Sequence, residues 1–463
     1  MKRTLAVFVL LWSSVSTVAA DGLRVGFAVA DVTPPPTYRM AGSYSEHAAE
    51  GVLDPILAKA IYLEQGTTKA CLIVVDVCGH ERGLVKDVRE AISKSTGVPV
   101  DHVSLSATHT HGGPMHYDPV LKAMYARSNA AAGTPDRHDL GGYPKKFTAG
   151  CITAGIDAWK NAKPAAAASG IGKTAGIAFN RRYRLKNGSY AMNPGKLSPS
   201  IAAAVGPTDP DLPFVLFRDV AGKPFGSLCS FAMHTTVYGG MKFSADHPAS
   251  LQASLRTKFG ADFVSLYGEG CAGDVNQIDT SVGMPEPAPD VYGAKLAAAL
   301  LAAEPTKIET PMLKVRVGSV DAPLRANRPN DLEVMRDRLS GPVAAKTPFL
   351  DKVEAYRVLM VDHMRTETGP KRPLPVQVFT LGTQTAIVTL PHEVFVELGL
   401  EIRRRSPYPH TMIVTIANEV DVYVPTKKAF SEGSYEVVNS PYEPGVGELL
   451  VEEAVRLLHE SRK

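Results

Sequence analysis

The sequence predicts an α/β fold with a functional site at the C-terminal ends of its strands. Short, β-branched-rich apolar runs bounded by Gly, Pro or Asp are typical of buried strands, and the amphipathic segments between them of helices. The expected strands are Leu23–Ala28, Cys71–Val77, Val103–Ala107, Phe214–Phe217, Leu228–Met233, Phe263–Tyr267, Ala386–Leu390 and Met412–Ile416. The expected helices are Gly83–Ser95, Tyr143–Asn161, Pro248–Phe259, Val291–Ala303 and Glu393–Arg404. Because strands and helices alternate, a mixed α/β architecture is favoured over a sandwich.

The first twenty residues have the pattern of a secretory signal peptide. Lys2 and Arg3 give a positive start, an apolar stretch follows, and the small residues 18–20 offer a cleavage site before Asp21. We therefore expect a mature chain of residues 21–463 that is secreted or periplasmic. An uncleaved N-terminal anchor is the alternative. After cleavage, no segment has the length and apolar character of a transmembrane helix.

Composition excludes some partners and leaves others open. The formal net charge of the 463 residues is +3, and removal of Lys2 and Arg3 lowers it to +1. This balance gives no electrostatic basis for binding nucleic acid. The five cysteines are an odd number without a C-x-x-C pair, so they indicate neither a disulfide framework nor a cysteine-only zinc site, and at most two bridges could form.

Two segments differ in composition from their surroundings. Residues 325–371 are more charged, have a helical pattern and are bracketed by Pro329 and Pro373, which predicts a helical subdomain or lid-like insertion. The Ala-rich stretch after Pro164 is expected to be a turn or a helix end. No internal sequence repeat is apparent.

Three familiar motifs are incomplete. Gly172-Lys173-Thr174 has Ala167 where a phosphate-binding loop needs its first glycine. His392-Glu393 begins an H-E-x-x-H pattern, but Val396 stands where the second histidine belongs. A G-x-S-x-G nucleophile elbow is absent from the sequence. These absences argue against a nucleotide site of this type, a helical zinc motif and the usual serine nucleophile.

The strongest local signal is His109-x-His111, which follows the expected strand Val103–Ala107 and precedes a Gly-Gly-Pro turn. Residues i and i+2 of an extended segment point to the same side, so both histidines can face one cleft. Strand C-terminal ends are where α/β folds collect catalytic groups. The spacing alone leaves open which of the two binds a metal.

Three further strand ends carry potential ligands. Leu228–Met233 leads into His234, and Ala386–Leu390 leads into Glu393 at the expected start of a helix. The strand that ends at Ile416 is followed by Tyr423. Taken singly, each has a structural explanation: a buried histidine, a helix-start glutamate favoured by the dipole, or a packed tyrosine.

Together these stretches resemble the catalytic domain of the neutral, non-lysosomal ceramidases over residues 21–463. Their order along the chain is the order found in that family, which is more specific than any one stretch. The sequence ends soon after Glu448, so the C-terminal immunoglobulin-like domain typical of the family is not expected. The matching stretches are Val25-Gly26-Phe27, Asp31 to Pro35, Ala60 to Glu64, His109 to Pro114, Asn180-Arg181, Phe231 to His234, Gly273-Asp274-Val275, Leu390 to Glu393, Ala417-Asn418, Tyr423-Val424 and Tyr435-Glu436.

The resemblance implies a Zn²⁺ site and a set of substrate-side residues. Imidazole and carboxylate are ordinary zinc ligands, and a zinc ion with an open position activates water. The residues on the substrate side would stabilise the developing oxyanion or hold the substrate, and His111 would protonate the leaving amine. The implied zinc ligands are His109, His234, Glu393 and Tyr423. The implied substrate-side residues are His111, Arg181 and Tyr435.

The resemblance fails at one position near the reaction centre. Ceramidases carry a serine just after the Gly-Asp-Val stretch, whereas this chain has Asn276, followed by Gln277 where proline is usual. An asparagine can donate an N–H to an oxyanion but cannot act as a nucleophile. Asn276 is therefore expected to be a catalytic residue of the oxyanion-binding type.

The expected function is hydrolysis of the N-acyl amide of ceramide, or of a ceramide-like lipid, to a fatty acid and an amine base by an exported zinc amidohydrolase. The alternatives are a zinc hydrolase of another amide or an ester, and a non-catalytic zinc-binding relative. The expected partner is an N-acyl lipid or other amide substrate, without nucleic acid. Transient contact with a membrane surface is compatible with such a substrate.

Overall fold

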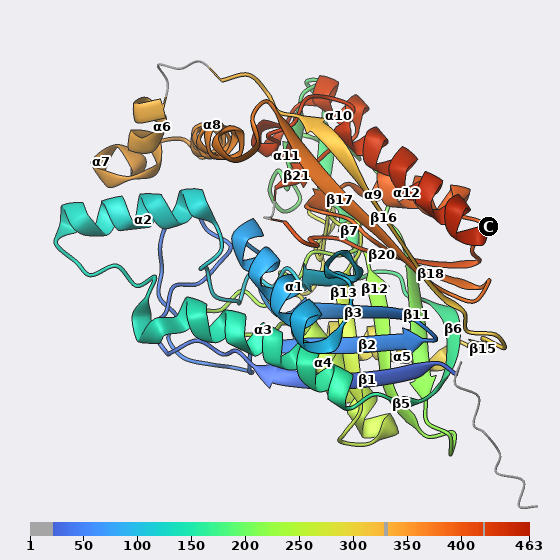
Figure 1. Ribbon diagram of the computed structural model, residues 1–463. Coiled ribbons are helices and arrows are strands. Elements are labelled where there is room, and N and C mark those ends of the chain that lie inside the picture. The colour runs from blue at the N-terminus through green and yellow to red at the C-terminus, as the bar shows by residue number, and fades with distance from the viewer. Residues whose placement is uncertain (1–21, 328–331, 420–421) are drawn as a thin grey trace, which may run out of the picture.

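The computed structural model describes residues 22–327, 332–419 and 422–463, so the expected signal peptide lies outside the described residues. Three mixed β-sheets surround a shared apolar core, and helices cover the outer face of each sheet (Figure 1). This confirms the predicted α/β class. Within the described ranges, no helix is long and apolar enough to cross a membrane.

The first sheet has the strand order β4-β3-β2-β1-β5. Its outer face is covered by helices α1 and α3, as Figure 1 shows. The strands are β1 (Arg24–Asp31), β2 (Leu57–Gln65), β3 (Thr68–Val75), β4 (Val103–Ala107) and β5 (Lys163–Pro164). The helices are α1 (Arg82–Thr96) and α3 (Tyr143–Lys160).

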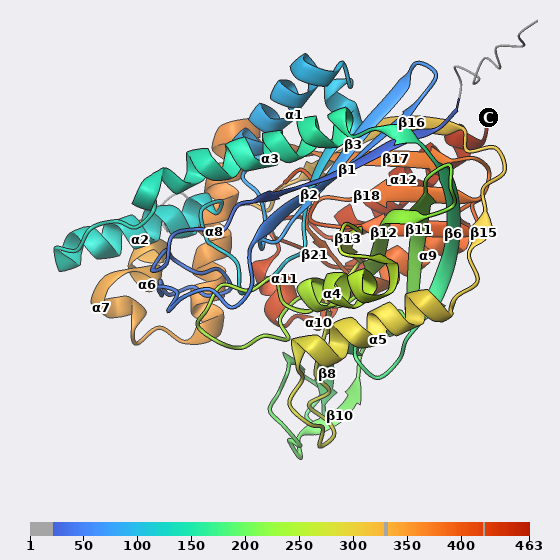
Figure 2. The same cartoon turned by 90° about the horizontal axis from the view of Figure 1, so that it is seen from below.

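The second sheet has the order β13-β12-β11-β6-β15, and α4 and α5 cover its outer face (Figure 2). Its strands are β6 (Ala166–Lys173), β11 (Asp211–Arg218), β12 (Pro224–Phe231), β13 (Val264–Glu269) and β15 (Thr306–Lys307). Its helices are α4 (His247–Phe259) and α5 (Pro289–Ala302).

The third sheet has the order β16-β17-β18-β20, and α12 packs along β16 and β17 with α9 beside it. Its strands are β16 (Leu313–Pro323), β17 (Lys371–Leu381), β18 (Thr385–Thr389) and β20 (His410–Val414). Its helices are α9 (Val396–Arg405) and α12 (Val446–Arg462).

The three sheets repeat one topology. In each, three antiparallel strands are followed by a crossover helix and a fourth strand parallel to the third, and a second helix packs beside the crossover helix. The three units are β1-β2-β3-α1-β4-α3, β6-β11-β12-α4-β13-α5 and β16-β17-β18-α9-β20-α12. The sequence shows no such repeat, because the three units share the order and pairing of their strands and helices but not their residues.

The inner strands are apolar on both faces, as expected for strands covered on both sides. In β3, Leu72 and Val74 face the core shared by the three sheets, whereas Cys71 and Ile73 face the layer of α1 and α3. All five cysteines are buried, and none forms a disulfide. The shared core fixes the three sheets against one another, so the ends of their parallel strands meet at one place.

Two sequence predictions of secondary structure are wrong. The Ala-rich stretch after Pro164 is not a turn or helix end but the strand β6, whose small side chains accept close packing. A Cβ atom at Gly170 would lie 3.1 Å from the Phe214 ring, for example. The helix expected from Glu393 begins at Val396, because Glu393 pairs with Tyr423 in a short parallel ladder.

The remaining elements lie around the strand ends. The described part of the charged segment contains the helices α6, α7 and α8, which lie near α2 at one end of the molecule (Figures 1 and 2). These helices are α2 (Pro119–Ala132), α6 (Leu332–Leu339), α7 (Gly341–Ala344) and α8 (Phe349–Thr368). The others are α10 (Lys427–Glu432), α11 (Tyr435–Asn439) and the 3-10 turns Val100–His102 and Leu140–Gly142. The small sheets consist of β7 (Phe179–Asn180) with β14 (Val275–Asn276), β8 (Arg182–Leu185) with β9 (Tyr190–Met192) and β10 (Ile201–Ala204), and β19 (Glu393–Val394) with β21 (Tyr423–Val424).

Candidate metal centre and active site

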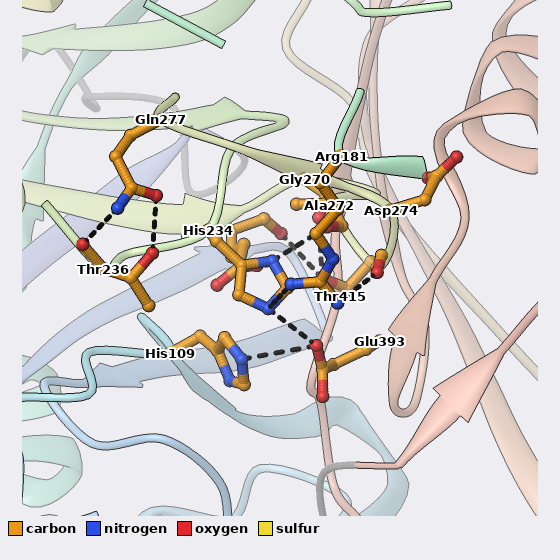
Figure 3. A network of polar contacts seen from close by, with 12 residues as sticks. His109, Arg181, His234, Thr236, Gly270, Ala272, Asp274, Gln277, Glu393 and Thr415 are labelled. Carbon is orange, nitrogen blue, oxygen red and sulfur yellow. Dashed lines mark hydrogen bonds and ion pairs between the residues drawn. The ribbon is translucent and has the colours of Figure 1, made fainter. Parts of the chain in front are cut away.

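Three buried donor atoms converge where the strand ends meet. Nε2 of His234 lies 3.0 Å and Nε2 of His109 lies 3.4 Å from Oε2 of Glu393. The three residues follow β4, β12 and β18, one from each sheet. Figure 3 shows both imidazole rings directed at the Glu393 carboxylate.

Both rings are oriented by backbone carbonyls. Nδ1 of His109 lies 2.9 Å from the carbonyl oxygen of Cys78, and Nδ1 of His234 lies 2.9 Å from that of Ala272. A carbonyl only accepts, so each Nδ1 carries a proton and donates it, and Nε2 is the ring nitrogen that faces Glu393. Metal-binding histidines are typically held this way.

The donor set fits a zinc ion. Nε2 of His109 and Oε2 of Glu393 are buried without a hydrogen-bond partner, as expected of metal ligands. Two imidazole nitrogens and one carboxylate oxygen within 4.8 Å of one another are a common zinc-ligand combination. Nε2 of His234 accepts from Nη1 of Arg181 at 3.1 Å, a bond that coordination would replace.

The fourth predicted ligand, Tyr423, lies beside this cluster. It pairs with Glu393 in the β19–β21 ladder and lines the same cavity as His109. Its ring centroid is 5.4 Å from that of Tyr435. The structure therefore brings all four predicted ligands to one place.

The backbone at the site is not the extended segment predicted from the sequence. His109 has φ +63° and His392 has φ +68°, left-handed conformations that are uncommon for residues other than glycine. The chain therefore leaves the extended conformation at His109, and the prediction that alternation puts both side chains on one side is wrong. The two histidines still share a cavity, and their ring centroids lie 5.1 Å apart.

A cavity of about 310 Å³ opens onto the cluster. Its floor includes His109, His111 and Glu393, and its wall is formed by α2, α8 and the segment 42–45. The aromatic and apolar wall residues are Tyr44, Tyr117, Leu121, Phe349, Tyr356, Tyr423 and Tyr435. The predicted residues His111 and Tyr435 both line this cavity.

Arg181 does not line the cavity. Its guanidinium lies behind the cluster, where Nε donates to Glu436 at 2.8 Å and Nη2 to the Gly273 carbonyl at 2.8 Å. Its Cζ atom is 5.4 Å from the Tyr423 ring centroid. In this position Arg181 supports His234 and Tyr423, and the contact with substrate expected from the sequence stays a prediction.

The Gly273-Asp274-Val275 stretch ties the pieces of the site together. The Asp274 carboxylate accepts from the Val396 N–H at 2.8 Å and from Nδ2 of Asn180 at 2.8 Å. The Val275 carbonyl accepts the backbone N–H of His234 at 3.1 Å. A Cβ atom at Gly273 would lie 2.5 Å from the Glu393 carbonyl oxygen, so only glycine permits this approach.

Charge in the site favours an ionised Glu393 and a neutral His111. Burial lowers the pKa of His109, but Cys78, Glu269 and Glu393 outweigh it and raise that pKa well above its usual value. Burial opposes ionisation of Glu393, but His109 and His234 outweigh it and hold the pKa of the carboxyl well below its usual range. Burial lowers the pKa of His111 well below its usual value, and the neighbouring His109 and His234 lower it further. His111 is therefore neutral near pH 7.

Asn276 lies in β14, beside the residue that holds the His234 backbone, but not in the cavity wall. Its Oδ1 accepts from the Ile278 N–H at 3.3 Å.

Three residues of the site were given no role from the sequence: Cys78, Glu269 and Glu436. Oε1 of Glu269 lies 3.8 Å from Nδ1 of His234. Cys78 and Glu269 lie at strand ends, and this position is the sequence feature that could have identified them as site residues.

None of the protein-family models searched matches the chain. Neutral ceramidase A of Dictyostelium discoideum is 26% identical in an alignment of 233 positions that covers 47% of this chain and 29% of that protein, so the match spans less than a third of that protein's length. The crystal structure of neutral ceramidase from Pseudomonas aeruginosa superimposes with a TM-score of 0.69 at 19% identity, covering 96% of this chain and 75% of that chain. A structure described as ceramidase complexed with C2 gives the same TM-score of 0.69 and the same coverage at 18% identity. These findings confirm the predicted resemblance to neutral ceramidases and their α/β fold.

Proposed function

We propose that this relative of the neutral ceramidases is an exported zinc-dependent amidohydrolase that cleaves the N-acyl amide of ceramide or of a ceramide-like lipid. The observation that carries the proposal is the convergence of His109, His234 and Glu393 beside the cavity, with both Nε2 atoms facing Oε2 of Glu393. The sequence match to a neutral ceramidase supports the substrate class.

His109, His234, Glu393 and Tyr423 would hold the zinc ion. A bound zinc ion supplies a Lewis acid that polarises the amide carbonyl and lowers the pKa of water. The protein contributes the fixed orientation of its ligands. The carbonyls of Cys78 and Ala272 hold the two imidazoles, and the ladder with Tyr423 holds Glu393.

His111 would transfer the proton from the attacking water to the leaving nitrogen. Because burial keeps its imidazole neutral near pH 7, it can accept a proton from the attacking water and then give one to the leaving nitrogen. Tyr435 would donate to the developing oxyanion. Burial raises the pKa of this tyrosine, so its hydroxyl keeps the proton that donation needs.

The shape of the cavity suits an apolar acyl group beside a polar centre. Leu121, Phe349 and Tyr356 line the wall supplied by α2 and α8. The volume of about 310 Å³ lies near the lower end of the ~300–1,000 Å³ typical of ligand pockets. This favours entry of one end of a lipid around the scissile amide, while the rest of the molecule stays outside.

Turnover of a fluorescent N-acylsphingosine by the purified, zinc-loaded mature protein tests the proposal. An N-acyl amide of a short amine and the matching ester separate a ceramidase from a hydrolase of other amides or esters. His111→Ala should keep zinc and lose roughly 10²–10⁴-fold in rate, as removal of an acid/base group does. His459→Ala, on the last helix, is the matched control and should change neither. Absence of turnover on all three substrates by zinc-loaded protein would contradict an enzymatic role.

A further inference from the structure

Cys78 occupies the same place in the fold as a proposed zinc ligand. The last paired residues of the parallel ladders are Val75 in β3, Phe231 in β12 and Thr389 in β18. Three positions beyond them lie Cys78, His234 and His392, respectively, and Glu393 follows His392. Since the three units share one topology, Cys78 is the counterpart of His234 in the first unit.

The side chain of Cys78 lies within reach of two site histidines. Its Sγ atom is 3.5 Å from Nδ1 of His109, and donor atoms of Cys78, His109 and His111 all lie within 4.8 Å of one another. Zinc–ligand distances of ~2.3 Å to sulfur and ~2.0 Å to nitrogen separate the two ligand atoms by about 3.5 Å at a tetrahedral angle. Cys78 and His111 also line the cavity, so an ion can reach them from solvent.

The two nitrogens of His109 face different groups. Nε2 faces Glu393, whereas Nδ1 faces Cys78. We propose that Cys78, His109 and His111 form a second metal site for zinc or a similar thiophilic divalent ion, with His109 bridging it to the first site. Binding there displaces two protons, one from the thiol and one from Nδ1 of His109, and breaks the Nδ1–H···O bond to the Cys78 carbonyl.

The second site is therefore weaker than the first and is filled only by excess metal. An ion held by His111 occupies the nitrogen that the proposed function assigns to proton transfer. Zinc beyond one equivalent should then inhibit hydrolysis. This inhibition rests on the proposed function, whereas the metal site itself does not.

Cobalt titration of the metal-free protein tests the site independently of activity. The first equivalent of Co²⁺ should bind without sulfur ligation, and the second should produce a thiolate-to-cobalt charge-transfer absorption. Cys78→Ser should abolish that absorption and keep the first equivalent. Cys271→Ser, which alters another buried cysteine at a strand end, is the control and should leave both intact.

Three outcomes would overturn the proposal: no thiolate absorption with excess cobalt, an absorption that survives Cys78→Ser, or one that already appears with the first equivalent. In an active preparation, excess Zn²⁺ should inhibit the wild type and not Cys78→Ser, each compared with its own rate at one equivalent. An inactive protein that shows the second-equivalent absorption would contradict the proposed function and leave the site standing.

Discussion

Oε2 of Glu393 lies 3.0 Å from Nε2 of His234, although the two residues follow strands of different sheets. The contact exists because three sheets of one topology pack around a common core and bring their parallel strand ends together. The precision of the site is thus set by core packing and by the short ladders and backbone bonds at those ends.

Gly42 sets the position of His111. It has φ +83°, and a Cβ atom there would lie 2.5 Å from Nδ1 of His111. Gly42→Ala should displace the imidazole and lower turnover at least tenfold while zinc stays bound. Gly133→Ala is the matched control, because Gly133 also has a left-handed φ, +67°, but meets no atom within 4 Å.

Both substitutions should cost a similar ~1–2 kcal/mol of backbone strain, so their effects on unfolding are comparable and only Gly42→Ala should affect catalysis. Equal turnover in the two variants would show that His111 needs no such support, or has no catalytic part.

Glu436 is expected to hold the metal site through Arg181. Its side chain is fully buried, and its carboxylate bonds Arg181 at 2.8 Å and lies 3.5 Å from Nε of Arg182. Glu436→Gln leaves two buried cations without their shared countercharge and should destabilise the fold by about 3–5 kcal/mol and weaken zinc binding. Denaturant unfolding and zinc affinity measure the two effects.

Glu432→Gln is the comparison, because Glu432 bonds Arg182 at 2.9 Å without touching Arg181. It should lower stability and leave zinc affinity unchanged. A loss of zinc affinity as large as that of Glu436→Gln would argue against a specific effect through Arg181.

Sequence reasoning located the strands well, because their burial signal is local. The predicted Val103–Ala107 is the observed β4, and the end of that strand carries His109 as expected. The start of the helix after Glu393 was misplaced, since Glu393 pairs with Tyr423, which local periodicity cannot reveal.

The parts of Cys78 and Arg181 in the site could not be predicted from the sequence for a similar reason. Cys78 is equivalent to His234 only through the repeated topology, which leaves no trace in residue identity. Arg181 was expected to face the substrate, but its orientation is fixed by Glu436 and by the carbonyl of Gly273, both far away along the chain.

Asn276 keeps its predicted oxyanion role as a hypothesis. If that role is correct, Asn276→Ala should cost a few kcal/mol of transition-state stabilisation, as loss of one oxyanion donor does, and appear mainly in kcat. Asn276→Ser should keep activity or raise it toward ceramide. An unchanged kcat in Asn276→Ala would instead assign Asn276 to the support of the turn that holds Ile278.

Acid should destabilise the fold through His80. Burial lowers the pKa of this histidine to about 4, below the ~6.5 of an unfolded histidine. The unfolded chain therefore binds the proton first, and stability falls as the pH drops from about 6.5 to about 4, by at most about 3 kcal/mol.

His80→Leu should remove this part of the acid sensitivity. Urea unfolding at pH 7.5 and pH 5 gives the loss of stability for each protein, and the other titrating groups cancel in the comparison. Equal losses in wild type and variant would show that His80 does not titrate as its burial requires.

The zinc content of purified protein tests the central claim most directly. We expect close to one zinc ion per chain in the wild type after dialysis against metal-free buffer. His234→Ala and Glu393→Ala should each lose most of it, whereas His247→Ala, which alters a buried histidine of α4 outside the cluster, should retain it. Full zinc content in both cluster variants, or a wild type that binds no zinc, would contradict the assigned metal centre.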